Sequence, residues 1–170
     1  ASRRAGAEGI PMATVSLDAV DVRFPDGTTG LSGVSLDVRD GEFVALVGPS
    51  GSGKSTCLMM LAGFESPTRG KIVLDGTELN NIPPYKRDIG VVFQNYALFP
   101  HLTVRENVAF GLRARGMSKA DAVQPVREAL ALVRMQDFAD RGIAGLSGGQ
   151  QQRVAVARAL VVRPDLLLLD

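Results

Sequence analysis

A glycine-rich segment at residues 48–55 carries the clearest chemical signal in the sequence. It reads Gly48-Pro49-Ser50-Gly51-Ser52-Gly53-Lys54-Ser55 and matches the pattern G-x-x-x-x-G-K-[ST] in full. Glycines let successive backbone amides turn toward phosphate oxygens, and a helix that follows adds its positive N-terminus. The pattern predicts that Lys54 reaches the β- and γ-phosphates of a nucleotide and that the Ser55 hydroxyl ligates Mg²⁺. A chance glycine-rich turn is the alternative, and the strand expected before the segment and the helix expected after it argue against that alternative.

A second helix start with uncovered amides is expected at Ser147. In Leu146-Ser147-Gly148-Gly149-Gln150, the serine stands three residues before a glutamine, which is the spacing of a capping box. The two glycines between them leave the first amides of the helix uncovered, so that an anion can approach the positive helix end. The alternative for this segment is an ordinary capped helix.

In this order, the glycine-rich segment (the P-loop, residues 48–55) and residues 146–150 (the signature motif) are the motifs of ATP-binding cassette (ABC) ATPases, which the chain resembles from about Thr14 to Asp170. The resemblance implies that Gln94, at the end of an expected strand, is the Q-loop glutamine that contacts Mg²⁺ and the attacking water. Asp170 ends an apolar run in the Walker B pattern and is expected to hold Mg²⁺ through water. Phe24 falls where the family places an aromatic residue that stacks on adenine, with a buried core Phe as the alternative.

The motifs and the resemblance together give the expected site residues. Those expected to act in catalysis are Lys54 and Gln94, and those expected to hold the metal are Ser55, Gln94 and Asp170. Those expected to bind the nucleotide are Phe24, Gly48, Pro49, Ser50, Gly51, Ser52, Gly53, Lys54, Ser55, Thr56, Ser147, Gly148, Gly149 and Gln150. Two single residues are expected to stay outside the catalytic set: His101 on a surface or in a structural role, and Cys57 as a small buried apolar residue.

The resemblance further implies hydrolysis of ATP to ADP and phosphate, with ATP and Mg²⁺ bound between two copies of the chain. Residues 82–112 are most similar to importer ATPases for polyamines, sugars and iron, and among these to the spermidine/putrescine subgroup. The expected partners are therefore membrane-spanning permease subunits and, indirectly, a solute-binding protein. No nucleic-acid partner is expected, and the expected location is the cytoplasmic face of the cell membrane.

Several alternatives to this function stay open. The same ATPase role could serve sugar or ferric iron import, or the chain could be a non-transport ABC ATPase acting on nucleic acid or ribosomes. An ABC ATPase acting on nucleic acid or ribosomes would need a long coiled-coil insertion, and the interval between Lys54 and Ser147 leaves no room for one. A P-loop kinase or GTPase is contradicted by the signature motif and by the absence of a guanine-reading N-K-x-D sequence. A non-functional fragment is the least specific alternative.

Composition and charge exclude several other classes. The 170 residues include 19 Lys and Arg and 18 Asp and Glu, so the formal net charge is +1. This balance indicates neither a basic surface for binding nucleic acid nor a polybasic membrane anchor. Hydrophobic residues make up 45% and charged residues 22%, which excludes a wholly disordered chain. The single cysteine cannot form an internal disulfide.

Hydrophobic periodicity predicts the elements that position these residues. Strands are expected near residues 15–24 (with a bulge), 34–38, 43–47, 71–74, 89–93 and 166–169. Helices are expected over residues 55–62, 104–112, 118–135 and 147–162, with Pro125 kinking or dividing the third. The apolar runs at 43–47 and 166–169 are typical of strands buried on both faces of a parallel sheet.

The expected fold class is α/β, with a P-loop NTPase (RecA-like) core, an antiparallel β-subdomain and a helical ABC-specific subdomain over about residues 95–160. Residues 1–13 are expected to be a flexible tail and 14–170 a partial, C-terminally truncated ABC ATPase domain. In the family, the general-base glutamate directly follows the Walker B aspartate, and the dimerising D-loop and a switch histidine come later. We therefore expect the 170 residues by themselves to bind ATP weakly and to hydrolyse almost none.

Overall fold

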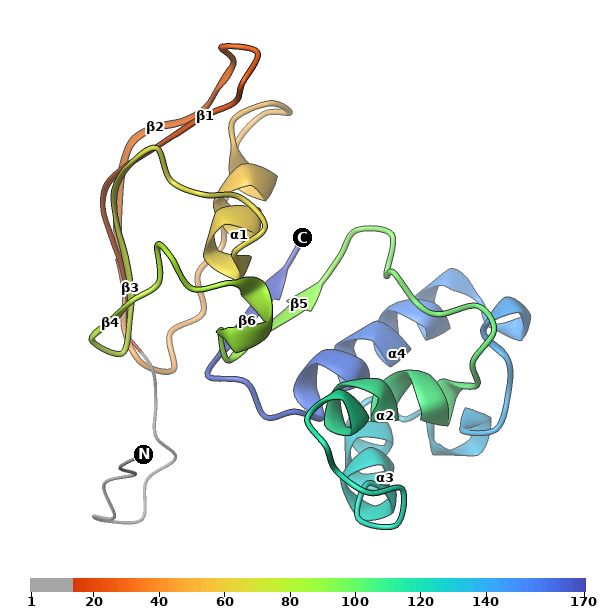
Figure 1. Cartoon of the computed structure of the whole chain (residues 1–170). Helices are drawn as coiled ribbons and strands as arrows, with labels where there is room; N and C mark the ends of the chain where they lie inside the picture. Colours follow the sequence, from red (N-terminus) through yellow and green to blue (C-terminus); the bar gives the residue numbers. More distant parts are fainter. Residues whose placement is uncertain (1–13) are drawn as a thin grey trace. The chain divides into compact units, whose positions relative to one another are not determined.

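The structure, a computed structural model, describes residues 14–170, which divide after Arg87 into two compact units (Figure 1). The tail expected at residues 1–13 lies outside the described residues. Within the described part, no helix is both long and apolar enough to cross a membrane.

The first unit contains an antiparallel sheet of four strands in the order β2-β1-β3-β4 (Figure 1). The strands are β1 (Val15–Arg23), β2 (Thr29–Val38), β3 (Arg69–Leu74) and β4 (Thr77–Glu78). A two-residue turn joins β3 to β4, and both turn residues, Asp75 and Gly76, have positive φ, which Asp-Gly hairpin turns require. This sheet confirms the expected antiparallel β-subdomain.

The bulge expected in the first strand is confirmed. The pairing of β1 with β2 shifts register between Leu17 and Val20, and Ala19 between them has a φ of 45°. An extra residue in one strand of an antiparallel pair reverses the faces to which later side chains point. The shift explains how Val15 and Leu17 before the bulge and Val20 and Val22 after it are all buried although their alternation changes phase.

Helix α1 (Lys54–Ala62) contacts β2 and closes at Gly63, as the sequence predicted. Gly63 has a φ of 89°, and its amide donates to the carbonyls of Met59 and Met60, so that two end carbonyls of the helix have partners. The buried residues of the helix are Cys57, Met60, Leu61 and Ala62. Cys57 is therefore the small buried residue that was expected, and burial raises the pKa of its thiol.

The side chain of Arg87 is buried against the C-terminal end of α1. Its guanidinium donates to four carbonyls: Nε to Ile82 (2.7 Å), Nη1 to Met60 and Leu61 (2.8 Å each), and Nη2 to Leu79 (2.8 Å). A positive charge at this end complements the helix dipole, and burial lowers the pKa of the group. A Cβ at Gly63 would lie 2.7 Å from Arg87 Nε, so the close approach requires glycine there.

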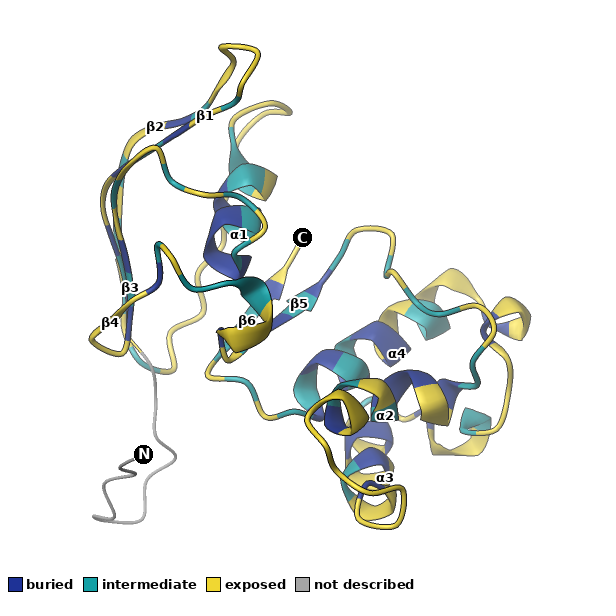
Figure 2. Cartoon of the chain, viewed as in Figure 1, coloured by how far each residue is buried: buried dark blue, intermediate teal, exposed yellow. Residues whose placement is uncertain are grey.

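The prediction of a strand at residues 43–47 is wrong. Among the strands that the structure describes, none pairs with this segment, which has no regular secondary structure. A parallel strand is held by hydrogen bonds to its neighbours, and without them its apolar side chains have no sheet face against which to pack. Phe43 and Val47 are accordingly 86% and 88% exposed, in the exposed stretch that leads from β2 to α1 (Figure 2).

The second unit combines a pair of parallel strands with three longer helices. Strand β5 (Ile89–Val92) pairs with β6 (Leu166–Leu169), which confirms both expected strands, and the pair is parallel. Burial of β6 is less complete than expected, since only Leu168 is buried and Leu169 is 52% exposed. The helices are α2 (Val104–Ala114), α3 (Val123–Leu132) and α4 (Gly148–Leu160).

Apolar faces of α2, α3 and α4 form a common core, and each helix also has exposed residues (Figure 2). Residues of this core include Val104, Val108, Leu112, Val126, Leu130, Met135, Val154 and Ala157. The third helix is shorter than the predicted range 118–135, because it begins only at Val123, after a turn. Pro125 thus lies in its first turn, where a missing N–H breaks no helical hydrogen bond, so Pro125 neither kinks nor divides the helix.

Candidate nucleotide-binding site

The glycine-rich loop at residues 48–53 leads directly into α1, and Gly53 is the N-cap residue of that helix. Gly53 has a φ of 88°, and a Cβ there would lie 2.5 Å from the carbonyl oxygen of Gly30 on β2. Only glycine fits this close backbone approach. Gly51, with a φ of 81°, also adopts a conformation that L side chains rarely take. The loop therefore has the backbone of an anion-binding turn in front of a helix N-terminus.

The Lys54 side chain folds back over this loop. Its Nζ donates to the carbonyl oxygens of Gly48 (2.9 Å) and Pro49 (2.7 Å) and to the Ser52 hydroxyl (3.2 Å). All three acceptors are neutral groups of the loop itself. Hydrogen bonds to an ionised phosphate are shorter and stronger than those to neutral acceptors, so the ammonium group can exchange these partners for phosphate oxygens.

Phe24 lies beside the start of α1. A Cβ placed on Gly30 would be 2.8 Å from Thr56 Cγ2 and 2.9 Å from Phe24 Cε2, so the aromatic ring and the helix both border this glycine. The ring is only half-buried, and it therefore keeps a face on which a base could stack. Ser55, on the first turn of the same helix, is exposed. The structure thus brings Phe24 and residues 48–56 together in the first unit.

Gln94 and Asp170 follow the two parallel strands of the second unit at the same sheet edge. Val92 pairs with Leu169, and the Asp170 amide donates to the Val92 carbonyl at 3.0 Å. Both Gln94 and Asp170 are exposed. Among residues 14–170, no group of three or more His, Cys, Asp or Glu side chains is placed to hold a metal ion. Oxygen donors such as those of Ser55, Gln94 and Asp170 suit Mg²⁺, which proteins usually bind through one or two carboxylates together with substrate phosphates. Their metal role stays a prediction.

The capping box predicted at Ser147 is present at the start of α4. The Gln150 amide donates to the Ser147 hydroxyl at 3.4 Å, and the Ser147 amide donates to Gln150 Oε1 at 2.8 Å. The first amides of a helix have no intrahelical acceptor, and here they belong to Gly148 and Gly149. Both glycines are exposed, and a Cβ on either would meet nothing within 4 Å, so the start of the helix is accessible from solvent. The helix start can accept an anion, and its role in nucleotide binding stays a prediction.

Two polar side chains in the second unit, the buried Asn107 and the half-buried Arg158, were not among the expected site residues. Asn107 is fully buried, and its side chain exchanges hydrogen bonds with the amide and carbonyl of Phe99 (2.8 and 3.1 Å). Arg158 on α4 donates to the carbonyls of Tyr96 and Ala97. The signal was available in the sequence, since each polar residue stands among apolar residues on the buried face of its helix. The partners of such a residue depend on the tertiary fold.

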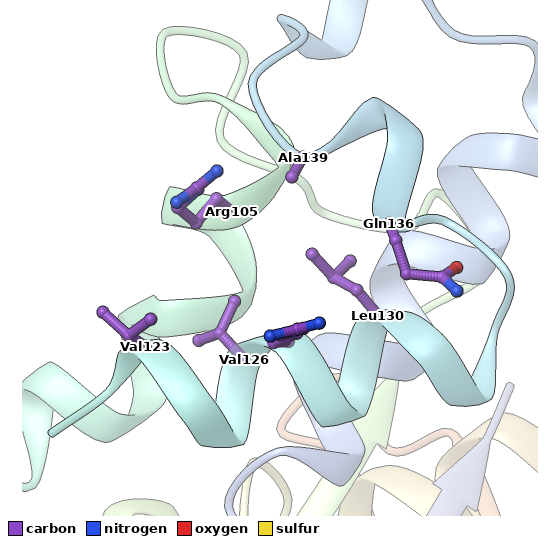
Figure 3. Close-up of a pocket in the computed structure, with 7 residues that line it drawn as sticks. Arg105, Val123, Val126, Leu130, Gln136 and Ala139 are labelled. Atoms are coloured by element: carbon purple, nitrogen blue, oxygen red, sulfur yellow. The ribbon is translucent and has the colours of Figure 1, made fainter.

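A groove about 210 Å³ in volume lies between α2 and α3 of the second unit (Figure 3). Its lining includes the apolar side chains of Val123, Val126 and Leu130 and the guanidinium groups of Arg105 and Arg127. An adjoining hollow shares Arg105, Val123 and Val126 and continues the groove toward Lys119. His101, which was expected on a surface or in a structural role, is exposed, and its ring centroid lies 6.2 Å from that of Phe99.

Comparison with known proteins matches residues 31–170 to the family model described as ABC transporter. The spermidine/putrescine import ATP-binding protein PotA of Rubrobacter xylanophilus is 55% identical over 172 aligned positions, which cover 100% of this chain and 45% of that protein. The putrescine transport ATP-binding protein PotG of Escherichia coli is 56% identical over 145 positions, covering 85% of this chain and 38% of that protein. The chain thus spans less than half the length of these relatives.

Among solved structures, the chain resembles the ATP-binding cassette MJ0796, seen as a dimer in a post-hydrolysis state bound to ADP and Pi. The TM-score is 0.83 at 36% sequence identity, and the match covers 92% of this chain and 73% of that chain. The ABC ATPase fold class predicted from the sequence is confirmed by this likeness and by the family match.

Proposed function

Because the chain belongs to the ABC transporter family, we propose that it is the nucleotide-binding part of an importer subunit that hydrolyses ATP to drive polyamine uptake. One observation carries the proposal: two helix N-termini, of α1 and α4, are each preceded by a backbone that leaves amides open to an anion. The first lies in the P-loop and the second in the signature motif, so the chain can contribute to a nucleotide site in two ways.

The P-loop residues would bind the phosphates of ATP. The amides around Gly51 and Gly53 and the N-terminus of α1 would stabilise phosphate oxygens, and Lys54 would exchange its loop carbonyls for the β- and γ-phosphates. Phe24 would stack on the adenine, a contact worth about 1–3 kcal/mol per base. Catalysis of phosphoryl transfer consists mostly of such positioning and charge neutralisation.

Mg²⁺ would neutralise charge on the phosphates when bound, with Ser55, Gln94 and Asp170 as its protein ligands. Gln94 would in addition orient the attacking water, since its side-chain amide offers both a donor and an acceptor. The carboxyl ends of β5 and β6 place Gln94 and Asp170 at one sheet edge, which supports a shared task for them.

Two copies of the chain would enclose the nucleotide. The open amides of Gly148 and Gly149 would approach the γ-phosphate held by the P-loop of the partner copy. The dimeric MJ0796 cassette bound to ADP and Pi, at 36% identity, supports this arrangement. Each copy would then supply one of its two helix N-termini to each nucleotide.

The proposed solute is a polyamine, because the relatives PotA and PotG are named as spermidine/putrescine import and putrescine transport proteins. Uptake requires membrane-spanning permease subunits, so the protein would lie at the cytoplasmic face of the membrane. The groove between α2 and α3 has an apolar floor with Arg105 and Arg127 in its lining. We propose that it receives a cytoplasmic helix of a permease subunit with apolar residues on one face and acidic residues beside them.

Uptake by cells that lack the gene tests this function. Cells without the protein should take up labelled spermidine and putrescine at least about tenfold more slowly, and the full-length gene should restore uptake. Uptake of labelled maltose and ferric citrate in the same cells should not change. A loss of maltose or iron uptake with normal polyamine uptake would overturn the polyamine assignment and leave the ATPase role intact.

A further inference from the structure

We propose that Arg158 is a positioning residue that ties the loop after Gln94 to the signature helix α4, so that the Gln94 side chain follows the movement of that helix. The inference rests on the proposed function, in which Gln94 orients the attacking water and the start of α4 meets the γ-phosphate. It adds a residue that is not among the proposed ligands of ATP or Mg²⁺.

Arg158 binds the loop through two separate hydrogen bonds. Nη1 donates to the Ala97 carbonyl at 2.6 Å, and Nη2 donates to the Tyr96 carbonyl at 2.8 Å. The guanidinium carbon also lies 5.7 Å from the centroid of the Phe99 ring. Within residues 14–170, no carboxylate forms an ion pair with Arg158, so carbonyls and an aromatic ring are its recorded partners. Partial burial lowers the pKa of this guanidinium.

The carbonyls that Arg158 binds belong to an unusual piece of backbone. Tyr96 and Ala97 have φ values of 62° and 43°, in the left-handed region that non-glycine residues rarely adopt. Such conformations persist where surrounding contacts fix them. Two local hydrogen bonds, from the Tyr96 amide to Phe93 and from the Ala97 amide to Asn95, complete the turn (2.8 Å each). Gln94 lies inside this turn, so the restraint that Arg158 supplies acts within three residues of the Gln94 backbone.

Helix α4 connects this restraint to the signature motif. The helix begins at Gly148 and contains Arg158, so both lie on one rigid element without a break. Buried Ala155 and Ala159 of the same helix pack with Val92 at the end of β5, and Tyr96 and Leu98 pack against this cluster. A displacement of the start of α4 is therefore carried to the turn that holds Gln94. A half-buried guanidinium with two fixed donors suits this task better than a flexible ammonium group.

The far end of the same loop is held from another helix. Asn107 on α2 bonds the backbone of Phe99 and donates to the Thr103 carbonyl at 2.9 Å. Asn107 thus fixes residues 99–103 to α2, whereas Arg158 fixes residues 96–97 to α4. The two restraints are separable by mutation, and only the Arg158 restraint acts next to Gln94.

The first test compares kinetic constants in the full-length protein assembled with its permease subunits. We expect Arg158→Met to lower kcat for ATP by about 10- to 100-fold, the effect of misplacing a positioning group by about 1 Å, with KM for ATP changed less than about twofold. Arg158→Lys, which keeps the charge and can reach one carbonyl, should recover part of the loss. Arg163→Met is the matched control, because this exposed arginine forms a long ion pair of 3.9 Å with Glu128, and the kcat of the variant should equal that of the wild type.

A double-mutant cycle with Gln94→Ala decides between positioning and a merely structural role. If Arg158 acts through Gln94, the double variant should hydrolyse ATP no more slowly than Gln94→Ala alone. Losses of kcat that multiply, or Arg158 variants with normal kcat, would overturn the proposal. Arg158→Lys serves in the same cycle if Arg158→Met does not fold. A wild-type protein that does not hydrolyse ATP would instead contradict the proposed function, so the two failures are distinguishable.

Discussion

Replacing Lys54 with Ala in the full-length protein is expected to lower ATP hydrolysis by about 10²–10³-fold, the usual loss when one preorganised donor to a transition-state charge is removed. Lys54 supplies a side-chain cation that the loop already holds at Gly48 and Pro49, within reach of any phosphate on that loop. Phosphate release at saturating ATP measures the effect. ATP affinity should also fall, since the ammonium interacts with the ground state as well.

Two further variants make the Lys54 result specific. Lys71→Ala removes an exposed lysine of β3 in the same unit and should leave phosphate release unchanged. Lys54→Arg keeps the charge but not the shape of the ammonium group, and we expect it to remain impaired because the two cations are not interchangeable at a tight site. Turnover at the wild-type rate in Lys54→Ala would remove Lys54 from the site.

Replacing Ser147 with Arg is expected to abolish the ATP-induced dimer while leaving ATP binding to the single chain within about twofold of wild type. The bulky side chain would fill the open space in front of Gly148 and Gly149, where the γ-phosphate of the partner's nucleotide is proposed to lie. The P-loop of the same chain is untouched. Light scattering with and without ATP measures the dimer, and an unchanged dimer would contradict the two-chain site.

The loss of a helix cap needs its own control in this experiment, because capping by Ser147 contributes about 1 kcal/mol to stability. Thr103 caps α2 with the same reciprocal pattern, in which its hydroxyl accepts from the Glu106 amide and the Glu106 carboxylate accepts from the Thr103 amide. Thr103→Arg should therefore cost similar stability without affecting dimer formation. The comparison separates the loss of the cap from the blocked phosphate site.

Local patterns predicted the parts of this site that local chemistry determines. The helix start at Ser147 and the helix end at Gly63 are formed as expected, because a cap depends on residues within one turn of it. The bulge in β1 was visible as a change in the phase of alternation. Strands β5 and β6 were predicted from short apolar runs, and the structure pairs them in parallel.

Features that depend on distant neighbours were predicted less well. The apolar run at residues 43–47 indicated a buried strand, but a run of this kind becomes a strand only where neighbouring strands offer hydrogen bonds. The start of α3 was placed too early, because Pro125 was interpreted as an interruption and not as a residue of the first turn. Arg87 and Arg158 donate to backbone carbonyls 27 and 62 residues away in the sequence, which no periodicity reveals.

Transport in proteoliposomes tests the central claim most directly. The full-length protein is reconstituted with its permease subunits, ATP and Mg²⁺ are supplied on the side of the ATP-binding subunit, and phosphate release and spermidine accumulation are measured in the same sample. We expect both to rise with ATP, and Lys54→Ala to lower both together by about 10²–10³-fold. Spermidine accumulation that persists at the wild-type rate in Lys54→Ala, or that proceeds without phosphate release, would contradict the claim.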